Sequence, residues 1–346
     1  MAVEAPKKRS CAVLALTQGG CTLGQRLAKL LQGDFFTCKG QLREVFTLVW
    51  QEYQEIVCIM ATGIVVRTIT PLLQDKYHDP AVVVCDEQGK FAISLISGHL
   101  GGANQLAERV AADLGGQAVL TTASDVLGLT ALDLWCRDLG LTVSDKSDFT
   151  RAMGKLVDQG SLTVASDYPL PPLPPDLEVT TDREGADLLI TASTDGPAGT
   201  ALLHPKALVF GIGCNRGTTA TVIARAVAAT CAQHQLAPEA IARLASIDLK
   251  KDQQGLLDFG RKQGFTIDFF PSDQLNQIEG IDTSPAVLRA TGAKAVAEPA
   301  ALLSGGAGST LLIKKMKWTD VTTAVAEIAD PLAITTFHRK KGTTQQ

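Results

Sequence analysis

The stretch SLISGHLGGANQLAERVAADLGG, residues 94–116, places a strand, a glycine-rich bend and a helix in one short segment. Its first residues read as a buried strand, and after the bend apolar residues recur at helical spacing, at positions 103, 106, 107, 110 and 114. Gly115 and Gly116 follow, where a helix commonly ends. A strand that passes through a short bend into an amphipathic helix is typical of α/β proteins.

The bend places His99 directly before the expected helix N-terminus. Free N–H groups and the positive end of the helix dipole lie there, so an anion or a developing oxyanion could bind. The same environment is expected to lower the pKa of His99, which favours a neutral imidazole and a general-base role. A tight turn whose histidine binds a backbone carbonyl is the alternative. Spacing alone leaves both open.

Apolar runs and helical patterns alternate along most of the 346 residues. The run Pro171-Pro172-Leu173-Pro174-Pro175 fits neither a regular helix nor a central strand, and it interrupts this alternation. We therefore predict an α/β fold with an N-terminal α/β domain at 1–145 and a C-terminal α/β domain at 206–340. A smaller Pro-rich middle module or linker at 146–205 joins them.

The composition excludes several classes of protein. Apolar residues make up 45% of the chain and charged residues 20%, with a net charge of -4, which gives no case for nucleic acid or an anionic membrane as a partner. No segment approaches the roughly 20 apolar residues of a membrane span, and no signal peptide is recognised. The eight cysteines form no zinc-like cluster, so we expect a reducing cytoplasm and no metal site.

Charged residues before the bend offer a second candidate site. Arg67 and Lys76 could clamp carboxylates, for which arginine offers bidentate geometry. The segment 81–97 is predicted to be a β-hairpin, and Asp86 ends its first strand. From there Asp86 could reach the same face as His99. A set of surface ion pairs is the alternative interpretation.

The segment GIGCNRGTT, residues 211–219, follows a predicted strand and opens a predicted helix. Its glycines have the spacing GxGxxxG rather than the dinucleotide fingerprint GxGxxG, so NAD binding by an oxidoreductase is weakly supported. An anion-binding loop that uses Arg216 is favoured. Cys214 could be a nucleophile at a helix N-terminus, but the sequence indicates no histidine partner for it.

The segment AVAEPAALLSG contains Glu298, which is either a helix-start residue or a buried acid. Lysines follow it in an alternating strand pattern. Lys315 and Lys317 are predicted to share one face, while Lys314 takes the other. The default interpretation of such a run is a solvated edge strand.

The run from TGIVVRT through DPAVVV and SGHLGGAN to VLTTASD resembles the N-terminal signature of the CbiG family, the cobalt-precorrin 5A hydrolases of anaerobic cobalamin biosynthesis. VFGIGCNRGTT, SIDLKKD and VAEPAALLSG are similar to that family's C-terminal domain, which also occurs as the separate protein CobE. The chain departs from the pattern at Asn215, where a second basic residue is expected, and at Pro299, where a helix former is more usual.

The resemblance implies a cobalt-bearing tetrapyrrole substrate with many carboxylates and a δ-lactone. Water opens the lactone, and a two-carbon fragment leaves as acetaldehyde to give cobalt-precorrin 5B. No metal or cofactor of the enzyme's own is implied, because the cobalt arrives inside the substrate. Neighbouring enzymes of the cobalamin pathway are expected partners. A carrier that binds the corrinoid intermediate without chemistry is the rival interpretation.

On this resemblance, His99 activates water or relays a proton, Asp86 orients it, and Glu298 is an alternative base. The backbone of the bend would donate hydrogen bonds to the oxyanion or to a carboxylate. The residues expected to bind the substrate are Gly63, Arg67, Lys76, Gly98, Gly101, Gly102, Asn104, Gly213 and Arg216.

Overall fold

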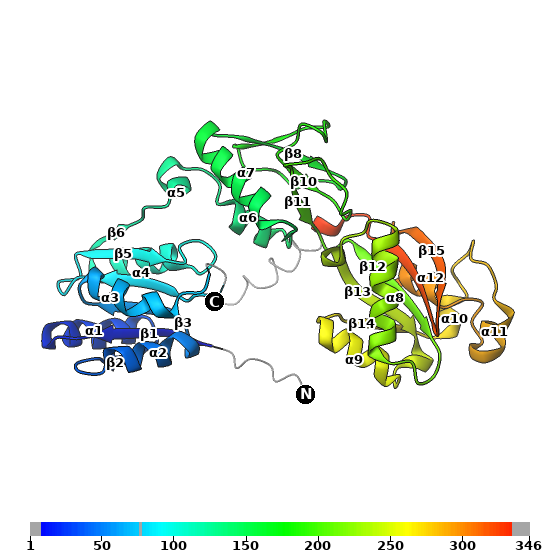
Figure 1. Cartoon of the computed structure of the whole chain (residues 1–346), viewed down its shortest axis with the longest axis horizontal. Helices are drawn as coiled ribbons and strands as arrows, with labels where there is room; N and C mark the ends of the chain where they lie inside the picture. The colour runs from blue at the N-terminus through cyan, green and yellow to red at the C-terminus, as the bar shows by residue number, and fades with distance from the viewer. Residues whose placement is uncertain (1–7, 76–77, 334–346) are drawn as a thin grey trace. The chain divides into compact units, whose positions relative to one another are not determined.

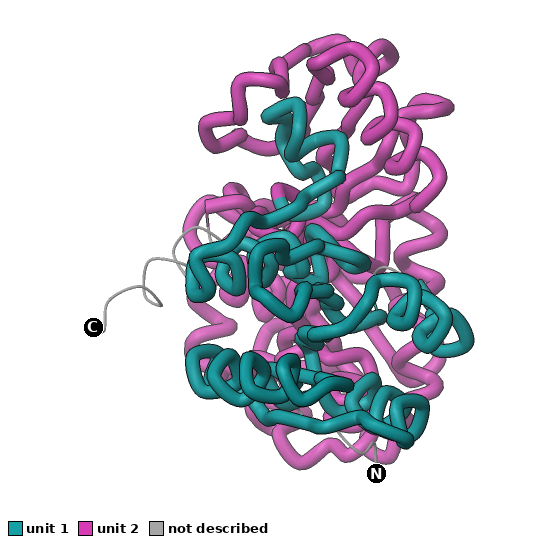
Figure 2. The backbone as a smooth tube through the Cα atoms, turned by 90° about the vertical axis from the view of Figure 1, so that its left-hand side faces the viewer, with its two compact units in different colours: residues 1–134 teal, residues 135–346 magenta. Residues whose placement is uncertain are grey.

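The computed structural model describes residues 8–75 and 78–333 and contains three β-sheets with helices between their strands (Figure 1). The fold class predicted from the sequence, α/β, is confirmed. The chain divides into two compact units, residues 1–134 and 135–346 (Figure 2). No helix in the described ranges has the length and apolar character needed to span a membrane.

The first unit is built on a six-stranded sheet in the order β2-β1-β3-β4-β5-β6. Strands β1 to β4 are parallel, β5 is antiparallel to β4, and β6 is parallel to β5. The strands are β1 (Arg9–Ala15), β2 (Asp34–Thr37), β3 (Tyr53–Ile59), β4 (Ala81–Cys85), β5 (Phe91–Ile96) and β6 (Gln117–Val119). The helices are α1 (Gln18–Leu30), α2 (Leu42–Glu52), α3 (Thr62–Ile69), the 3₁₀ turn Thr70–Leu72, α4 (Ala103–Leu114), α5 (Ala123–Leu127) and α6 (Leu132–Asp138), the last of which runs into the second unit.

Helices cover both faces of this sheet. Val13 of β1 packs with Leu27 of α1 and Leu106 of α4, whereas its neighbour Leu14 packs with Phe46 of α2 on the other face. Because successive residues of a strand point to opposite faces, a strand buried on both sides needs a continuous apolar run. The run CAVLA in β1 meets this need.

The segment 94–116 folds as predicted. Strand β5 ends at Ile96, and α4 ends at Leu114, where Gly115 takes a left-handed conformation with φ of 69°. The predicted hairpin is also confirmed, since β4 and β5 pair antiparallel around the turn that contains Gly89.

The second unit contains two five-stranded sheets. The middle sheet has the order β7-β11-β10-β8-β9 and is packed against α7 (Lys146–Gln159). Its strands are β7 (Thr142–Val143), β8 (Leu162–Ser166), β9 (Leu177–Val179), β10 (Leu188–Ile190) and β11 (Ala201–His204). The proline run 171–175 connects β8 to β9 outside any helix or strand. The segment predicted as a module or linker therefore holds a sheet, which begins with β7 before residue 146.

The C-terminal sheet has the order β14-β13-β12-β16-β15. Its strands are β12 (Leu208–Cys214), β13 (Ile241–Ile247), β14 (Ile267–Phe270), β15 (Thr310–Trp318) and β16 (Val321–Glu327). Its helices are α8 (Ala220–Gln233), α9 (Gln254–Gln263), α10 (Ser272–Leu275), α11 (Pro285–Thr291) and α12 (Ala297–Gly305), with 3₁₀ turns at Pro238–Ala240 and Asp248–Lys250. Strands β12 to β14 are parallel, and β15 and β16 form an antiparallel hairpin.

Close packing explains the first two glycines of the segment 211–219. A Cβ atom on Gly211 would overlap the carbonyl oxygen of Ala297 at the start of α12, and one on Gly213 would overlap the hydroxyl of Thr322 in β16. The two glycines thus let α12 and β16 approach β12. This packing accounts for a GxG pattern without any dinucleotide.

Replacing Gly211 with Ala tests this packing. The added methyl meets backbone atoms that cannot move independently of α12, so we expect a loss on the order of 3 kcal/mol in the free energy of unfolding. Gly154→Ala is the matched control, because that position in α7 has open space and a helical alanine is favoured by about 0.5–1 kcal/mol. Urea unfolding followed by circular dichroism measures both changes, and equal stability of G211A and the unmodified chain would contradict the argument.

Candidate active site

Three glycines shape the loop between β5 and α4. A Cβ atom on Gly98 would lie 2.8 Å from Asn104 Oδ1, and one on Gly101 would overlap Ser97. Gly102 has a φ of 88°, a left-handed conformation that side chains disfavour. These three positions of the loop therefore require glycine.

Some backbone N–H groups of this loop bind within it. The N–H groups of Gly102, Ala103 and Asn104 donate to the carbonyl oxygens of His99, Ser97 and Gly98 at 3.0–3.1 Å. They are not available to an oxyanion, which corrects part of the expectation for this bend. In the described part of the chain, the N–H groups of Leu100 and Gly101 are among those that have no such partner, so they remain as possible donors.

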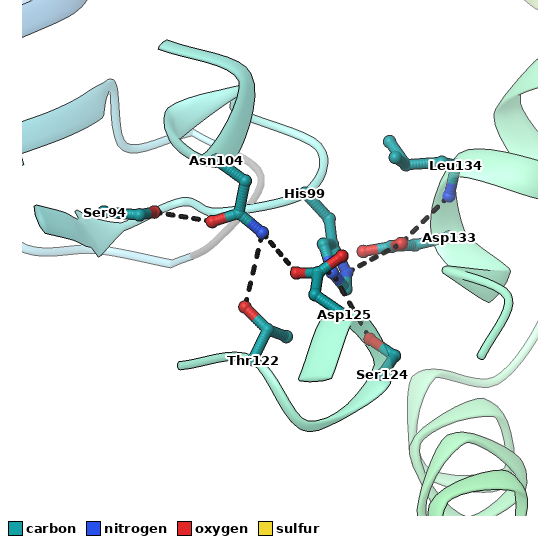
Figure 3. A network of polar contacts seen from close by, with 8 residues as sticks. All are labelled: Ser94, His99, Asn104, Thr122, Ser124, Asp125, Asp133 and Leu134. Atoms are coloured by element: carbon teal, nitrogen blue, oxygen red, sulfur yellow. Dashed lines mark hydrogen bonds and ion pairs between the residues drawn. The ribbon is translucent and has the colours of Figure 1, made fainter. Parts of the chain in front are cut away.

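Asn104, buried in the first turn of α4, holds the neighbouring polar groups in place (Figure 3). Its Oδ1 accepts a hydrogen bond from Ser94 Oγ at 2.6 Å. Its Nδ2 donates to Thr122 Oγ1 at 3.3 Å and to Asp125 Oδ2 at 2.5 Å. Asn104, predicted to bind substrate, thus positions the carboxylate of Asp125.

The imidazole of His99 lies between two carboxylates (Figure 3). Nε2 is 3.1 Å from Asp125 Oδ2, and Nδ1 is 3.3 Å from Asp133 Oδ1. The side chains of His99 and Asp133 are 15% and 8% exposed, whereas that of Asp125 is 31% exposed. A neutral imidazole carries one N–H, so two carboxylates facing both nitrogens favour the doubly protonated cation.

The pKa of His99 is raised above its usual value, mainly by the hydrogen bond to Asp133. Burial opposes the shift, while the charges of Asp133 and Asp125 and the hydrogen bond to Asp125 add to it. The expectation of a lowered pKa is therefore wrong, because these carboxylates outweigh the helix dipole. As an imidazolium, His99 has no lone pair with which to accept a proton, and it is a proton donor in this state.

Asp86 does not orient His99. Asp86 follows β4 and His99 follows β5. Because these neighbouring strands are antiparallel, the two residues lie beyond opposite ends of the strands. The six residues of β5 lie between these two ends and span about 20 Å at roughly 3.3 Å per residue. The carboxylate of Asp86 instead accepts hydrogen bonds from the N–H groups of Gln88 and Phe91 at 2.8 and 2.7 Å. It stabilises the hairpin turn.

The other candidates of the first unit lie apart from His99 or outside the described residues. Gly63 is the second residue of α3, which follows β3 at the same edge as Asp86. The exposed guanidinium of Arg67 donates to the carbonyl of Gly63 at 3.4 Å. Lys76 lies outside the described residues.

A basic cavity of about 500 Å³ lies in the second unit. Gly213 and Arg216 line it, as do Lys315 and Lys317. The default interpretation of these lysines as a solvated edge is incomplete, since β15 is an edge strand but both side chains border the cavity. Lys250, which was not among the predicted site residues, also lines the cavity. Its position after β13 was the available signal, because β12 and β13 are parallel neighbours whose carboxyl ends meet.

Cys214 lines this cavity, and Glu298 follows Ala297, which also lines it. Glu298 is 7% exposed, and its Oε1 accepts a hydrogen bond from the backbone N–H of Lys315 at 3.1 Å. That N–H lies where the register of β15 shifts against β16, so Glu298 stabilises the irregular strand. Burial raises the pKa of the Cys214 thiol, which disfavours the nucleophilic thiolate.

Comparison with known proteins agrees with the resemblance. The family model "Cobalamin synthesis G N-terminal" matches residues 44–125, and "Cobalamin synthesis G C-terminus" matches residues 208–326. The chain belongs to the CbiG family. The two ranges include His99, Asp125 and the basic cavity, whereas Asp133 lies outside them.

Two hydrolases from other organisms support this membership over most of the chain. Cobalt-precorrin-5A hydrolase of Priestia megaterium is 33% identical over 92% of this chain and 94% of its own length. The protein of the same name from Salmonella typhimurium is 32% identical over 87% and 93%. The solved structure of CobE, a protein from the cobalamin (vitamin B12) biosynthetic pathway, is 32% identical over 35% of this chain and 89% of its own, with a TM-score of 0.33.

The protonation of His99 can be tested with Asp133→Asn and Asp125→Asn. Removing either carboxylate should lower the pKa of His99 toward its usual value, and more so for Asp133, which makes the largest contribution. A titration of the histidine C2 protons by NMR, with the His99 signal assigned from a His99→Gln variant, measures the change. A His99 pKa that is the same in all three proteins would contradict the structure.

Proposed function

We propose that this chain is a cobalt-precorrin-5A hydrolase, which opens the δ-lactone of its cobalt-tetrapyrrole substrate with water and releases acetaldehyde to give cobalt-precorrin 5B. The observation that carries the proposal is the 33% identity, over 92% of the chain, to a relative with that name. The His99 network and the basic cavity support it, because they offer proton transfer and the binding of carboxylates.

His99 acts as the proton donor in this proposal. Water attacks the acyl carbon, the new C–O bond forms, and the bond from the acyl carbon to the ring oxygen breaks. The alkoxide that leaves needs a proton, and the imidazolium of His99 can supply it. The lactone thereby becomes a carboxylic acid and an alcohol. The hydroxyl then loses its proton as the C–C bond between the alcohol carbon and the macrocycle breaks. The alcohol carbon leaves as acetaldehyde, and the macrocycle retains the electron pair and takes up a proton.

Asp125 is the proposed acceptor of the proton that the attacking water loses. It is the more exposed of the two carboxylates at His99, and its hydrogen bond from Asn104 fixes its position. The free N–H groups of Leu100 and Gly101 are proposed donors to the oxyanion of the tetrahedral intermediate. Asp133, which is nearly buried, positions the ring of His99.

The proposal assigns no cofactor or metal to the protein, since the cobalt enters within the substrate. It places the enzyme in the cytoplasm, where its eight cysteines would stay reduced, next to the pathway enzymes that supply and consume the tetrapyrrole.

Release of acetaldehyde from cobalt-precorrin-5A under anaerobic conditions, followed with alcohol dehydrogenase and NADH, tests the function. We expect many turnovers from the unmodified chain and a kcat lowered by about 10²- to 10⁴-fold in His99→Gln, the range typical of a lost acid or base. His234→Gln is the control, because that exposed histidine ends α8 in the other unit. A folded protein that binds the tetrapyrrole without releasing acetaldehyde would be a carrier instead.

The pH dependence of kcat provides a second test of the donor role. A raised pKa means that the imidazolium persists above the usual value of His and is lost as the pH rises through the raised one. Activity should therefore fall on the alkaline side, and Asp133→Asn should move that fall to lower pH. If His99 were the base, kcat would rise over the same interval, which a pH profile of both proteins distinguishes.

A further inference from the structure

The cavity of the second unit has a strongly one-sided charge. Four cations line it, namely Arg216, Lys250, Lys315 and Lys317, against the single carboxylate of Asp320. The whole chain has a net charge of -4, so this concentration of positive charge is local. Low-dielectric walls around like charges strengthen their attraction for an anion.

The charges of the four cations are not paired among the described residues. Within residues 8–75 and 78–333, none of their side chains forms a hydrogen bond or an ion pair. Asp320 forms no ion pair with them among the described residues, and its Oδ1 accepts a hydrogen bond from Asn215 Nδ2 at 2.8 Å, so three of the four positive charges have no negative counterpart in the lining. Lys250 and Lys315 are half-buried, and their charges give up part of their hydration without a partner among the residues that the structure describes. A bound anion would restore this lost interaction.

The protein holds these cations on three separate elements. Arg216 lies in the loop after β12, Lys250 ends the 3₁₀ turn after β13, and Lys315 lies on β15. The buried Glu298 binds the backbone N–H of Lys315 where β15 shifts its register, which fixes the strand at that lysine. Such convergence of side chains from separate elements is typical of a binding site.

Apart from its charged residues, the cavity wall is mostly apolar, with four polar side chains, those of Asn215, Ser284, Thr291 and Thr322. One face of α11 and the start of α12 contribute alanine and valine side chains. Trp318 also lines the cavity, and its indole Nε1 donates to Thr323 Oγ1 at 3.0 Å, which fixes the ring. An occupant with a flat apolar body and several carboxylates matches both parts of this wall.

We infer that this cavity binds one edge of the tetrapyrrole substrate, with the acetate and propionate carboxylates on Arg216, Lys250, Lys315 and Lys317 and the macrocycle against the apolar wall. The inference rests on the proposed function for the identity of the ligand. A volume of about 500 Å³ accommodates an edge of the macrocycle rather than all of it. It assigns carboxylate recognition to the second unit and adds three lysines to the predicted Arg216.

Binding of cobalt-precorrin-5A, followed anaerobically by its absorbance change, tests the inference without requiring turnover. Lys250→Gln and Lys315→Gln should each raise the Kd about tenfold, as expected for a lost charge-assisted contact. Lys251→Gln and Lys314→Gln are matched controls, because each removes the same charge from an adjacent exposed lysine that does not line the cavity. These controls should bind within about twofold of the unmodified chain.

Two further measurements keep the result decisive. Far-UV circular dichroism reports whether the Lys250 and Lys315 variants fold. If either half-buried lysine proves necessary for folding, Arg216→Gln and Lys317→Gln still test the cavity, because these two side chains are exposed, and both changes should weaken binding. A substrate whose carboxylates are methyl esters should bind the unmodified chain more weakly and lose its discrimination between Lys250→Gln and Lys251→Gln.

The outcomes separate the two proposals. Unchanged Kd values in all four cavity variants, with acetaldehyde still released, would overturn the cavity assignment and leave the hydrolase function standing. Weakened binding in the cavity variants, with no acetaldehyde from any protein, would support the cavity and overturn the hydrolase. Absence of binding to the unmodified chain would overturn both.

Discussion

Two carboxylates on opposite sides of one imidazole set the chemistry of the first unit. Because Asp125 and Asp133 face both ring nitrogens of His99, the ring is held as a cation and its orientation is fixed. The surrounding structure serves this arrangement. Asn104 holds Asp125 from the first turn of α4, and the glycines of the loop let Asn104 approach the backbone closely. A change at any of these positions acts on His99 indirectly.

The elements of this unit were predictable from the sequence because their signals are local. Helical spacing after residue 102 and the Gly115 stop predicted α4, and two apolar runs around a glycine turn predicted the β4–β5 hairpin. That hairpin already excluded Asp86 as a partner of His99, since the two ends of a hairpin strand lie at opposite sheet edges. The prediction was wrong because two residues on the same face of a sheet can still lie far apart along the strands.

The partners of His99 were not predictable in the same way. Asp125 lies 26 residues further along the chain, and Asp133 is further still, in α6. Each contact depends on how the connection after β6 returns to the loop, which no local periodicity reports. The predicted direction of the His99 pKa shift was wrong for the same reason. A helix dipole can be inferred from the sequence, whereas a carboxylate that approaches only in the folded structure cannot. Lys250 differs, since the parallel order of β12 and β13 places it beside Arg216.

The two units use positive charge in opposite ways. In the first, the charge of His99 is compensated by two carboxylates, which would also repel an approaching carboxylate arm of a substrate. In the second, four cations have no ion pair within the described ranges and can bind those arms. A polyanionic substrate gains little by binding near His99 through its carboxylates, so the neutral lactone is the part suited to that site. Anchoring and proton transfer then belong to different groups, and each can be altered without the other.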